Sequence, residues 1–274
     1  MYMAPVITME EVDGRTIRVA RWISGQKDQL PILFFNGIGA NFELIAPFAE
    51  KLSERDFITF DMPGIGGSPD PTMPYRPWMI ARLASLLLDR FGYEKVDVMG
   101  ISWGGGMAQQ FAIQFGSRVN TLTLIATSAG MLMMPGKLSS LTKMIDPRRY
   151  TDPNFMLHNF KTLYGGVDAG SGAHVSRISP PSRIGYLYQM LAMVGWTSAP
   201  WLPFVRARTL IMMGDADTIV PLINGKFLNS LIPHSTLEVI KGGGHLFLMA
   251  EADLCVELIR DFLDDLQPRR RKAA

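Results

Sequence analysis

Short apolar runs alternate with amphipathic stretches along most of this chain. The run at residues 31–35 is apolar throughout, which is typical of a parallel strand buried on both faces. Residues 77–91 instead place Leu83, Leu87 and Phe91 on one side of a helix. The predicted strands are residues 6–11, 16–23, 31–35, 57–60, 95–99, 119–126, 209–213 and 237–240, and the predicted helices are 42–52, 77–91, 105–112, one after Pro221, and 247–266. The first two strands are joined at Asp13-Gly14, which predicts a hairpin.

This alternation predicts an α/β fold with a mostly parallel central sheet and helices on both faces. It stops near residue 128 and resumes near residue 205, and the stretch between carries helical and irregular patterns. We therefore expect a helical cap or lid inserted between two core strands. The predicted organisation is a core of residues 1–127 and 205–267, a cap of residues 128–204 and a basic C-terminal tail of residues 268–274.

Composition fits a globular protein with a sizeable core, since 47% of residues are apolar and 19% are charged. The formal net charge is +2, and the four cations at positions 269–272 leave the preceding chain at 2 − 4 = −2. We therefore expect no nucleic-acid partner, and a tail that is a solvated end or contacts an anionic surface. Cys255 stands alone, so no disulfide framework is expected, and residues 1–5 suggest no signal peptide. Both features predict a cytoplasmic protein.

Residues 184–205 contain no charged residue and are long enough to span a membrane. Glycine, proline and polar residues interrupt this stretch, so we expect a buried cap helix and no transmembrane segment. Methionine and aromatic side chains form adaptable binding walls as well as ordinary cores. The predicted substrate contacts are Asn36, Met131, Tyr186, Tyr188, Met190, Met193, Trp196 and Trp201.

The candidate nucleophile is Ser102 in Gly100-Ile101-Ser102-Trp103-Gly104. A predicted strand precedes this G-x-S-x-G sequence and a predicted helix follows it, which is the context in which the motif forms a nucleophile elbow. Small residues on both sides allow a sharp turn that exposes the hydroxyl. The alternative is an ordinary helix-capping serine, which would need neither the glycines nor the strand.

A serine hydroxyl needs a base and an orienting acid to become nucleophilic at neutral pH. Among four histidines, His245 follows three glycines after the last predicted strand, where active sites of open α/β sheets lie. His234 is expected at the opposite edge of the sheet, and His158 and His174 in the cap. We therefore predict His245 as the base.

The acid is expected after the preceding strand, between serine and histidine in the chain. Asp215 and Asp217 both stand there; the family resemblance given below favours Asp217, since it implies an acid three residues after a glycine, here Gly214, and Asp215 is then a turn residue. Asp61 precedes the serine and is expected to fix the following glycine-rich turn through bonds to its backbone.

Acyl transfer also needs two donors for the tetrahedral oxyanion. The backbone N–H of Trp103 follows the nucleophile directly, and we assign the second donor to the backbone N–H of Ile38 in the loop at residues 36–39. A plain glycine-rich turn is the alternative for that loop. The chain has no complete phosphate-binding glycine motif and no histidine or cysteine cluster with metal spacing, so neither a cofactor nor a metal is expected.

A serine elbow, then an aspartate, then a histidine on an alternating chain resembles the α/β-hydrolases from about residue 15 to residue 265. The finer sequence resembles the intracellular depolymerases of medium-chain-length poly(3-hydroxyalkanoate). The segments that carry this likeness are residues 15–20, 35–41, 100–105, 108–112, 147–150, 195–198, 219–224 and 244–248. The resemblance implies Ser102, Asp217 and His245 as the triad and an aliphatic polyester stored as granules as the substrate.

The sequence thus predicts a serine hydrolase that cleaves poly(3-hydroxyalkanoate) through an acyl-enzyme. One alternative is a small-molecule carboxylesterase or a carbon–carbon-bond hydrolase with the same triad. Another is a non-catalytic granule-associated or ligand-binding protein on a hydrolase scaffold. Haloalkane hydrolysis is disfavoured because it usually needs a carboxylate where Ser102 stands.

Overall fold

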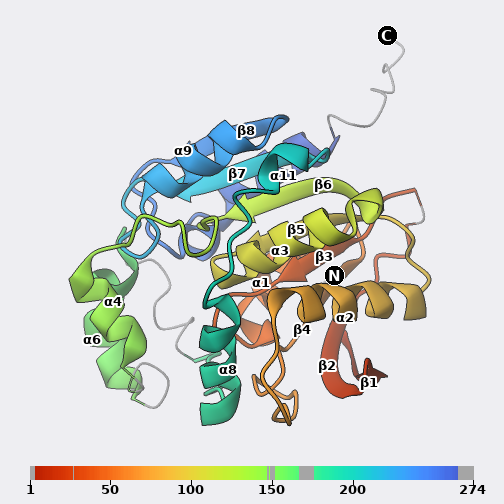
Figure 1. The fold of residues 1–274 in the computed structure, drawn as a ribbon, viewed down its shortest axis with the longest axis horizontal. Helices are drawn as coiled ribbons and strands as arrows, with labels where there is room; N and C mark the ends of the chain where they lie inside the picture. Colours follow the sequence, from red (N-terminus) through yellow and green to blue (C-terminus); the bar gives the residue numbers. More distant parts are fainter. Residues whose placement is uncertain (1–3, 27, 147, 149–151, 167–175, 265–274) are drawn as a thin grey trace.

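The protein folds around one eight-stranded sheet, seen in a computed structural model that describes residues 4–26, 28–146, 148, 152–166 and 176–264 (Figure 1). The predictions for His174 and for the tail at 268–274 lie outside the described residues. The strands are β1 (Val6–Val12), β2 (Arg15–Trp22), β3 (Ile32–Phe35), β4 (Phe57–Phe60), β5 (Val96–Ile101), β6 (Val119–Ile125), β7 (Arg208–Gly214) and β8 (Ser235–Ile240).

Their order in the sheet is β1-β2-β4-β3-β5-β6-β7-β8. β1 pairs antiparallel with β2 and β2 antiparallel with β4, whereas every other neighbouring pair is parallel. The sheet is therefore mostly parallel, as the buried apolar runs predict, and the predicted hairpin is its antiparallel edge. The carboxyl ends of β3, β5, β7 and β8 share one edge, so the loops that follow them meet there.

Helices cover both faces of the sheet. Their bounds are α1 (Ala46–Lys51), α2 (Pro77–Arg90), α3 (Trp103–Gln114), α9 (Leu222–Leu231), α10 (Phe247–Ala250) and α11 (Ala252–Asp264). Buried side chains of α2, α3 and α9 form one core with one face of the sheet, and those of α1, α10 and α11 form a second core on the other. In β3, Leu33 and Phe35 join the first core and Ile32 and Phe34 the second, which is the two-residue alternation of a strand.

Two predicted helices are each divided in two. The stretch at 42–52 begins with a 3₁₀ turn, η1 (Phe42–Leu44), before α1. Pro47 explains this break, because in the interior of one continuous helix its ring would clash with the carbonyl of Glu43. The stretch predicted at 247–266 is divided at Glu251, whose backbone leaves the helical region (φ −113°, ψ 42°) and separates α10 from α11.

The segment between β6 and β7 carries α4 (Leu138–Ile145), α6 (Pro153–Tyr164), α8 (Arg183–Met193) and the 3₁₀ turn η3 (Leu202–Phe204). We call residues 128–204 the inserted segment. Figure 1 shows α4 and α6 together at one end of the molecule, whereas α8 lies nearer the start of α2 and accepts hydrogen bonds from Arg76 and Trp103. None of the helices described is long and apolar enough to span a membrane. This holds for α8, which begins at Arg183 and otherwise lies in the charge-free stretch.

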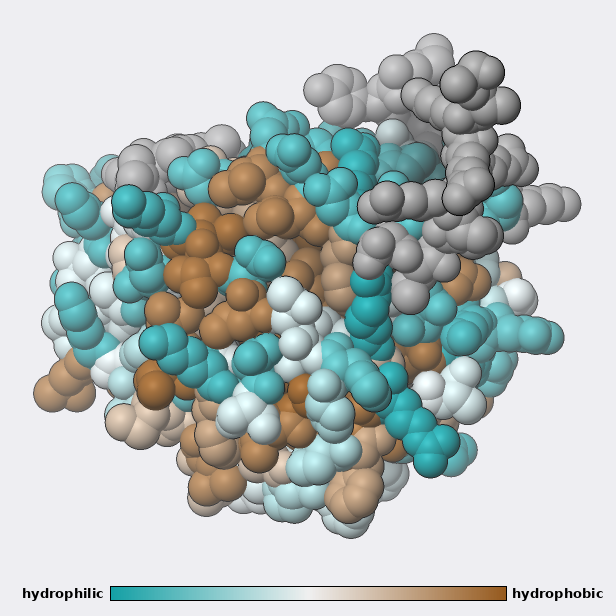
Figure 2. All heavy atoms as spheres, turned by 90° about the horizontal axis from the view of Figure 1, so that it is seen from above, coloured by the Kyte–Doolittle hydropathy of each residue, from teal (hydrophilic) through white to brown (hydrophobic). Residues whose placement is uncertain are grey.

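One face of the molecule exposes a broad apolar area. Figure 2 views the molecule from the side of α9 and β8, and apolar side chains (brown) gather in one region bordered by hydrophilic ones. Exposed large apolar side chains on these two elements are Ile223, Phe227 and Val239. β8 is an edge strand, so its outer edge has no neighbouring strand in the described sheet.

Candidate active site

Ser102 stands at the turn between β5 and α3 in a strained conformation. Its φ is 55° and its ψ is −121°, a backbone conformation that residues other than glycine rarely adopt. Surrounding bonds hold it there: its N–H donates to the Ile125 carbonyl (2.8 Å), and its own carbonyl accepts from the Gly105 N–H (2.9 Å) and the Thr127 hydroxyl (2.7 Å). These bonds aim the side chain away from the strand and toward the loops at the sheet edge.

The glycines on either side are required by close backbone contact. A Cβ at Gly104 would collide with the carbonyl oxygens of Phe35 and Asn36, and one at Gly100 would collide with the carbonyl of Gly104. The start of α3 therefore packs directly against the end of β3. This packing brings the loop after β3 beside the serine, and a Cβ at Gly37 would lie 3.8 Å from the Ser102 Cβ.

Three side chains from distant parts of the chain form one hydrogen-bonded series. His245 Nε2 lies 2.9 Å from Ser102 Oγ, and His245 Nδ1 lies 2.7 Å from Asp217 Oδ2. The other carboxylate oxygen of Asp217 accepts the N–H groups of Ile219 (2.8 Å) and Val220 (2.9 Å). The Asp217 side chain is fully buried and that of His245 nearly so. This is the geometry of a nucleophile, a base and an orienting acid.

The end of α6 touches both loops that carry the acid and the base. The Tyr164 carbonyl accepts the His245 N–H (2.6 Å), and the Tyr164 and His245 rings are parallel within 5° at 6.4 Å between centroids. Gly165 forms an isolated antiparallel bridge with Asp217, and the Thr218 hydroxyl donates to the Leu163 carbonyl (2.8 Å). The inserted segment therefore supports the positions of Asp217 and His245.

The two residues predicted to stabilise an oxyanion lie on either side of Ser102. Trp103 is the first residue of α3, and Ile38 lies in the loop after β3. Both residues line an apolar cavity that also reaches Ser102. The assignment of their N–H groups to the oxyanion remains a prediction.

Two cavities meet at the serine. The inner cavity is lined by Asn36–Ala40, Leu44, Ile45, Ile101, Ser102, Met144, Met156, Tyr164, Ile178, His245, Leu246 and Met249. The outer cavity is lined by Ile38, Ser102, Trp103, Gly106, Thr127, Ser128, Gly130, Met131, Met133, Leu141, Met144, Met190, Met193, Val194, Ile219 and Val220. They share Ile38, Ser102 and Met144. A substrate bound at Ser102 would therefore meet apolar walls on two sides.

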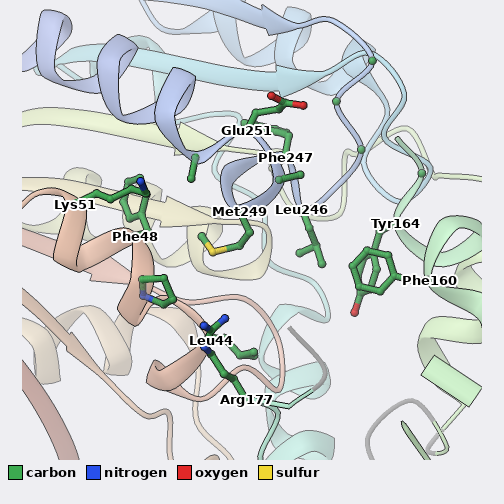
Figure 3. A pocket seen from close by; sticks show the side chains of 17 residues that line it. Leu44, Phe48, Lys51, Phe160, Tyr164, Arg177, Leu246, Phe247, Met249 and Glu251 are labelled. Atoms are coloured by element: carbon green, nitrogen blue, oxygen red, sulfur yellow. The ribbon is translucent and has the colours of Figure 1, made fainter. Parts of the chain in front are cut away.

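A third cavity adjoins the inner one and shares Leu44, Tyr164, Leu246 and Met249 with it. Figure 3 shows the rings of Tyr164 and Phe160 extending from α6 toward Leu246. These two rings are 5.0 Å apart between centroids in an edge-to-face arrangement. Aromatic and methionine side chains thus extend away from Ser102 into this third cavity, which Lys51, Arg177 and Glu251 also line.

The predicted substrate contacts divide into two groups. Asn36 lines the inner cavity, and Met131, Met190 and Met193 line the outer one. Tyr186, Tyr188, Trp196 and Trp201 line neither.

Hydrogen bonding and exposure account for most of this second group. The Trp196 indole N–H donates to Gln110 (2.8 Å), and the Tyr186 hydroxyl donates to the Met144 carbonyl (3.4 Å). Tyr188 packs against the core below α8, while Trp201 is 58% exposed at the surface.

Several lining residues were not predicted. Leu246 and Met249 follow the base by one and four residues, and this proximity to His245 is a signal that could have identified them. Ile219 and Val220 likewise follow Asp217. Met144 and Tyr164 reach the site from the inserted segment, where no pattern in the sequence indicates which side chain faces the serine.

The remaining titratable candidates lie outside the series. His234 directly precedes β8, at the opposite sheet edge, and His158 is exposed on α6 with Nδ1 2.7 Å from the Asn154 carbonyl. Asp215 accepts the Gly242 N–H (2.6 Å) and so ties the loop of Asp217 to the loop of His245. Within the described ranges, no group of three histidine, cysteine or acidic side chains could hold a metal ion.

Asp61 fixes a turn, as predicted. Its carboxylate accepts the N–H groups of Phe42 (2.8 Å) and Gly67 (2.9 Å) and pairs with Arg18 (3.2 Å). Burial raises the pKa of Asp61 to about 6, and the two N–H groups and Arg18 offset only part of that effect.

A family model for the alpha/beta hydrolase fold matches residues 31–167, which is half of the chain. The chain belongs to the α/β-hydrolase family. This establishes the predicted fold class. The matched residues include the Ser102 elbow, and the sheet continues beyond them through β7 and β8.

Relatives of this α/β-hydrolase include a "Poly(3-hydroxyalkanoate) depolymerase" of Ectopseudomonas oleovorans, 41% identical over 95% of this chain and 93% of that protein. A "2-hydroxy-6-oxononadienedioate/2-hydroxy-6-oxononatrienedioate hydrolase" of Comamonas testosteroni is 26% identical over 94% of this chain and 95% of its own length. A solved esterase from Exiguobacterium antarcticum matches 96% of this chain and all of its own with a TM-score of 0.80 at 22% identity, which supports the fold alone.

Proposed function

We propose that this α/β-hydrolase is a serine hydrolase that cleaves the ester bonds of intracellular, medium-chain-length poly(3-hydroxyalkanoate). The observation that carries the proposal is the hydrogen-bonded series from Ser102 through His245 to Asp217 at the meeting point of two apolar cavities. The depolymerase from Ectopseudomonas oleovorans, similar over nearly the whole chain, supports the substrate class.

In the first half of the reaction, Ser102 Oγ attacks the ester carbonyl while His245 Nε2 takes the hydroxyl proton. A bond forms between Oγ and the carbonyl carbon, and the carbonyl oxygen becomes an oxyanion that the N–H groups of Ile38 and Trp103 stabilise. Asp217 holds His245 in the tautomer that has Nε2 free to accept. The ester C–O bond then breaks, and His245 gives its proton to the leaving alkoxide.

In the second half, water replaces the alcohol beside His245. His245 removes a proton from this water, which attacks the acyl-enzyme carbonyl and forms a second oxyanion at the same donors. Collapse of that intermediate releases a 3-hydroxyacid or an oligomer and returns the proton to Ser102. Each side chain thus acts in both halves.

The apolar surroundings favour a water-insoluble acyl substrate. The walls of both cavities consist mainly of apolar side chains, and Met131 and Val194 of the outer cavity are 63% and 61% exposed. Exposed apolar side chains at the rim of a cavity are suited to contact with a hydrophobic surface. We therefore place the activity at the surface of cytoplasmic polyester granules, with residues 128–204 as the cap.

The test compares emulsified medium-chain-length polyester with short soluble esters, using wild type, Ser102→Ala and the surface control Ser230→Ala. Ser102→Ala should lower hydrolysis by at least about 10⁴-fold, and a fluorophosphonate probe should label wild type but not this variant. Ser230 lies on the exposed side of α9, so its variant should match wild type. Retained turnover in Ser102→Ala would refute the nucleophile, and turnover of soluble esters without polyester would refute the substrate.

A further inference from the structure

Gln189 is a fully buried polar side chain in the charge-free part of the inserted segment. Its exposed fraction is 0%, and it shares the buried side of α8 with Gly185 and Ala192. Burial of an amide is costly unless hydrogen bonds replace those lost to water. The hydrogen bonds of Gln189 should therefore explain why this buried position holds an amide.

Gln189 bonds to two residues that flank Ser102 in space, one in the loop after β3 and one at the start of α3. Its side-chain Oε1 accepts the N–H of Gly39 (2.8 Å), the residue directly after Ile38. Its backbone carbonyl accepts the indole N–H of Trp103 (3.1 Å), the residue directly after Ser102. One residue of α8 thus bonds to both segments that carry the proposed oxyanion donors.

α8 is itself held firmly at its other end. A Cβ at Gly185 would collide with the backbone of Gly64, so helix and loop are in direct contact there. The Ser182 N–H donates to the Gly64 carbonyl (3.0 Å), and the Ser182 side chain caps the helix by accepting the Gly185 N–H (2.8 Å). Gln189 lies one turn further along this fixed helix, so its acceptor has a defined position.

The amide is not fully satisfied. Gln189 Nε2 is buried and has no hydrogen-bond partner among the described residues. An unpaired buried donor costs stability, and such groups in a native protein call for an explanation. The presence of a glutamine at this position is explained if the acceptor on the same side chain is needed for activity.

We propose that Gln189 is a positioning residue of the oxyanion hole, which fixes the Ile38 loop and Trp103 relative to Ser102. This inference rests on the proposed function, because it assumes that Ile38 and Trp103 supply the donors. Donors stabilise an oxyanion only when they are aimed at it before the reaction. Loss of the Gly39 bond should therefore raise the barrier to acyl transfer without weakening substrate binding.

The chain offers a matched control in Gln109 of α3. Gln109 is also fully buried, and its amide bonds to the carbonyls of Gly105 and Ser128 and to the Ser198 hydroxyl. None of these bonds reaches the Ile38 loop. Gln109→Met removes a buried amide as Gln189→Met does, so both variants share the general cost of that change.

The experiment measures kcat, KM and boronate inhibition of the full chain on a soluble ester. A boronic acid forms a tetrahedral adduct with serine and so tests the oxyanion donors directly. Gln189→Met should lower kcat at least tenfold, leave KM within about twofold, and weaken boronate inhibition by the factor lost in kcat. Gln109→Met should stay within about twofold of wild-type kcat.

If Gln189→Met does not fold, Gln189→Asn replaces it, since it withdraws the amide by one methylene, about 1.5 Å. The inference is overturned if the folded variant keeps kcat within twofold, if Gln109→Met loses as much, or if kcat falls while boronate inhibition is unchanged. These outcomes differ from failure of the proposed function, in which wild type itself would not hydrolyse esters.

Discussion

Replacing Asp217 separates its role in catalysis from its role in the fold. Its carboxylate accepts three hydrogen bonds, one from His245 and two from the N–H groups of Ile219 and Val220. Asp217→Asn keeps an oxygen for the two loop N–H groups and removes the charge that orients the imidazole. Asp217→Ala removes both acceptor oxygens and with them all three hydrogen bonds.

The two variants should therefore match in rate and differ in stability. Loss of the orienting carboxylate costs about 10⁴-fold in turnover in a triad of this kind, or roughly 5.5 kcal/mol of barrier. Asp217→Ala also leaves two buried N–H groups unpaired. At about 1–3 kcal/mol each, it should lose roughly 2–6 kcal/mol of unfolding free energy that Asp217→Asn largely keeps.

The assays are kcat/KM on a soluble ester and urea unfolding of wild type and both variants, with rates compared where each variant is folded. His245→Gln should also lose activity by orders of magnitude, whereas His234→Gln should not, because His234 lies at the opposite sheet edge. Asp217→Asn with activity within tenfold of wild type would refute Asp217 as the orienting acid. Equal instability of the two Asp217 variants would refute the argument from the loop N–H groups.

Two further predictions concern groups outside the triad. The pKa of Asp61, raised by burial to about 6 from an ordinary 3.8, means that the stability contributed by its neutral form is complete below about pH 4 and is lost as pH rises through 6. This difference in pKa corresponds to roughly 3 kcal/mol of unfolding free energy. Between pH 4 and 7 the wild-type protein should therefore lose about 3 kcal/mol more unfolding free energy than Asp61→Asn. If the unfolding free energies of the two proteins change equally with pH, the reasoning is contradicted. Burial also raises the pKa of the Cys255 thiol to about 12. A thiol reagent at pH 8 should therefore modify the protein only as it unfolds. Rapid modification of the native protein would be inconsistent with that burial.

The centre of the sheet could be predicted because strands such as β3 and β4 are short apolar runs that need no distant information. β3 and β4 are buried at every position, and the predicted ranges differ from the observed ones by only a few residues at either end. The series Ser102, Asp217 and His245 could be proposed because parallel strands deliver the loops after them to one edge. Pro47 marks the division of one predicted helix, and its chemistry is visible in the sequence.

The substrate contacts could not be predicted to the same degree. α8 and the residues after it contain no charge after Arg183 until Arg206, so no polar face indicates which side points inward. Trp196 was expected at the cavity, but its indole N–H bonds to Gln110 and directs the ring to α3. Gln189, among the apolar residues, makes the informative contact with Gly39, 150 positions away, and no local pattern encodes that distance.

These contacts limit how a substrate can reach Ser102. The inserted segment bonds to the base through Tyr164 and to the Ile38 loop through Gln189. If residues 128–204 swung away as one body, both bonds would break, and His245 and the loop of Ile38 would lose their support together. The outer cavity reaches Ser102 with neither bond broken, because its exposed wall includes Met131 and Val194. Access along that wall would leave both bonds in place while the substrate binds, whereas displacement of the whole segment would break them.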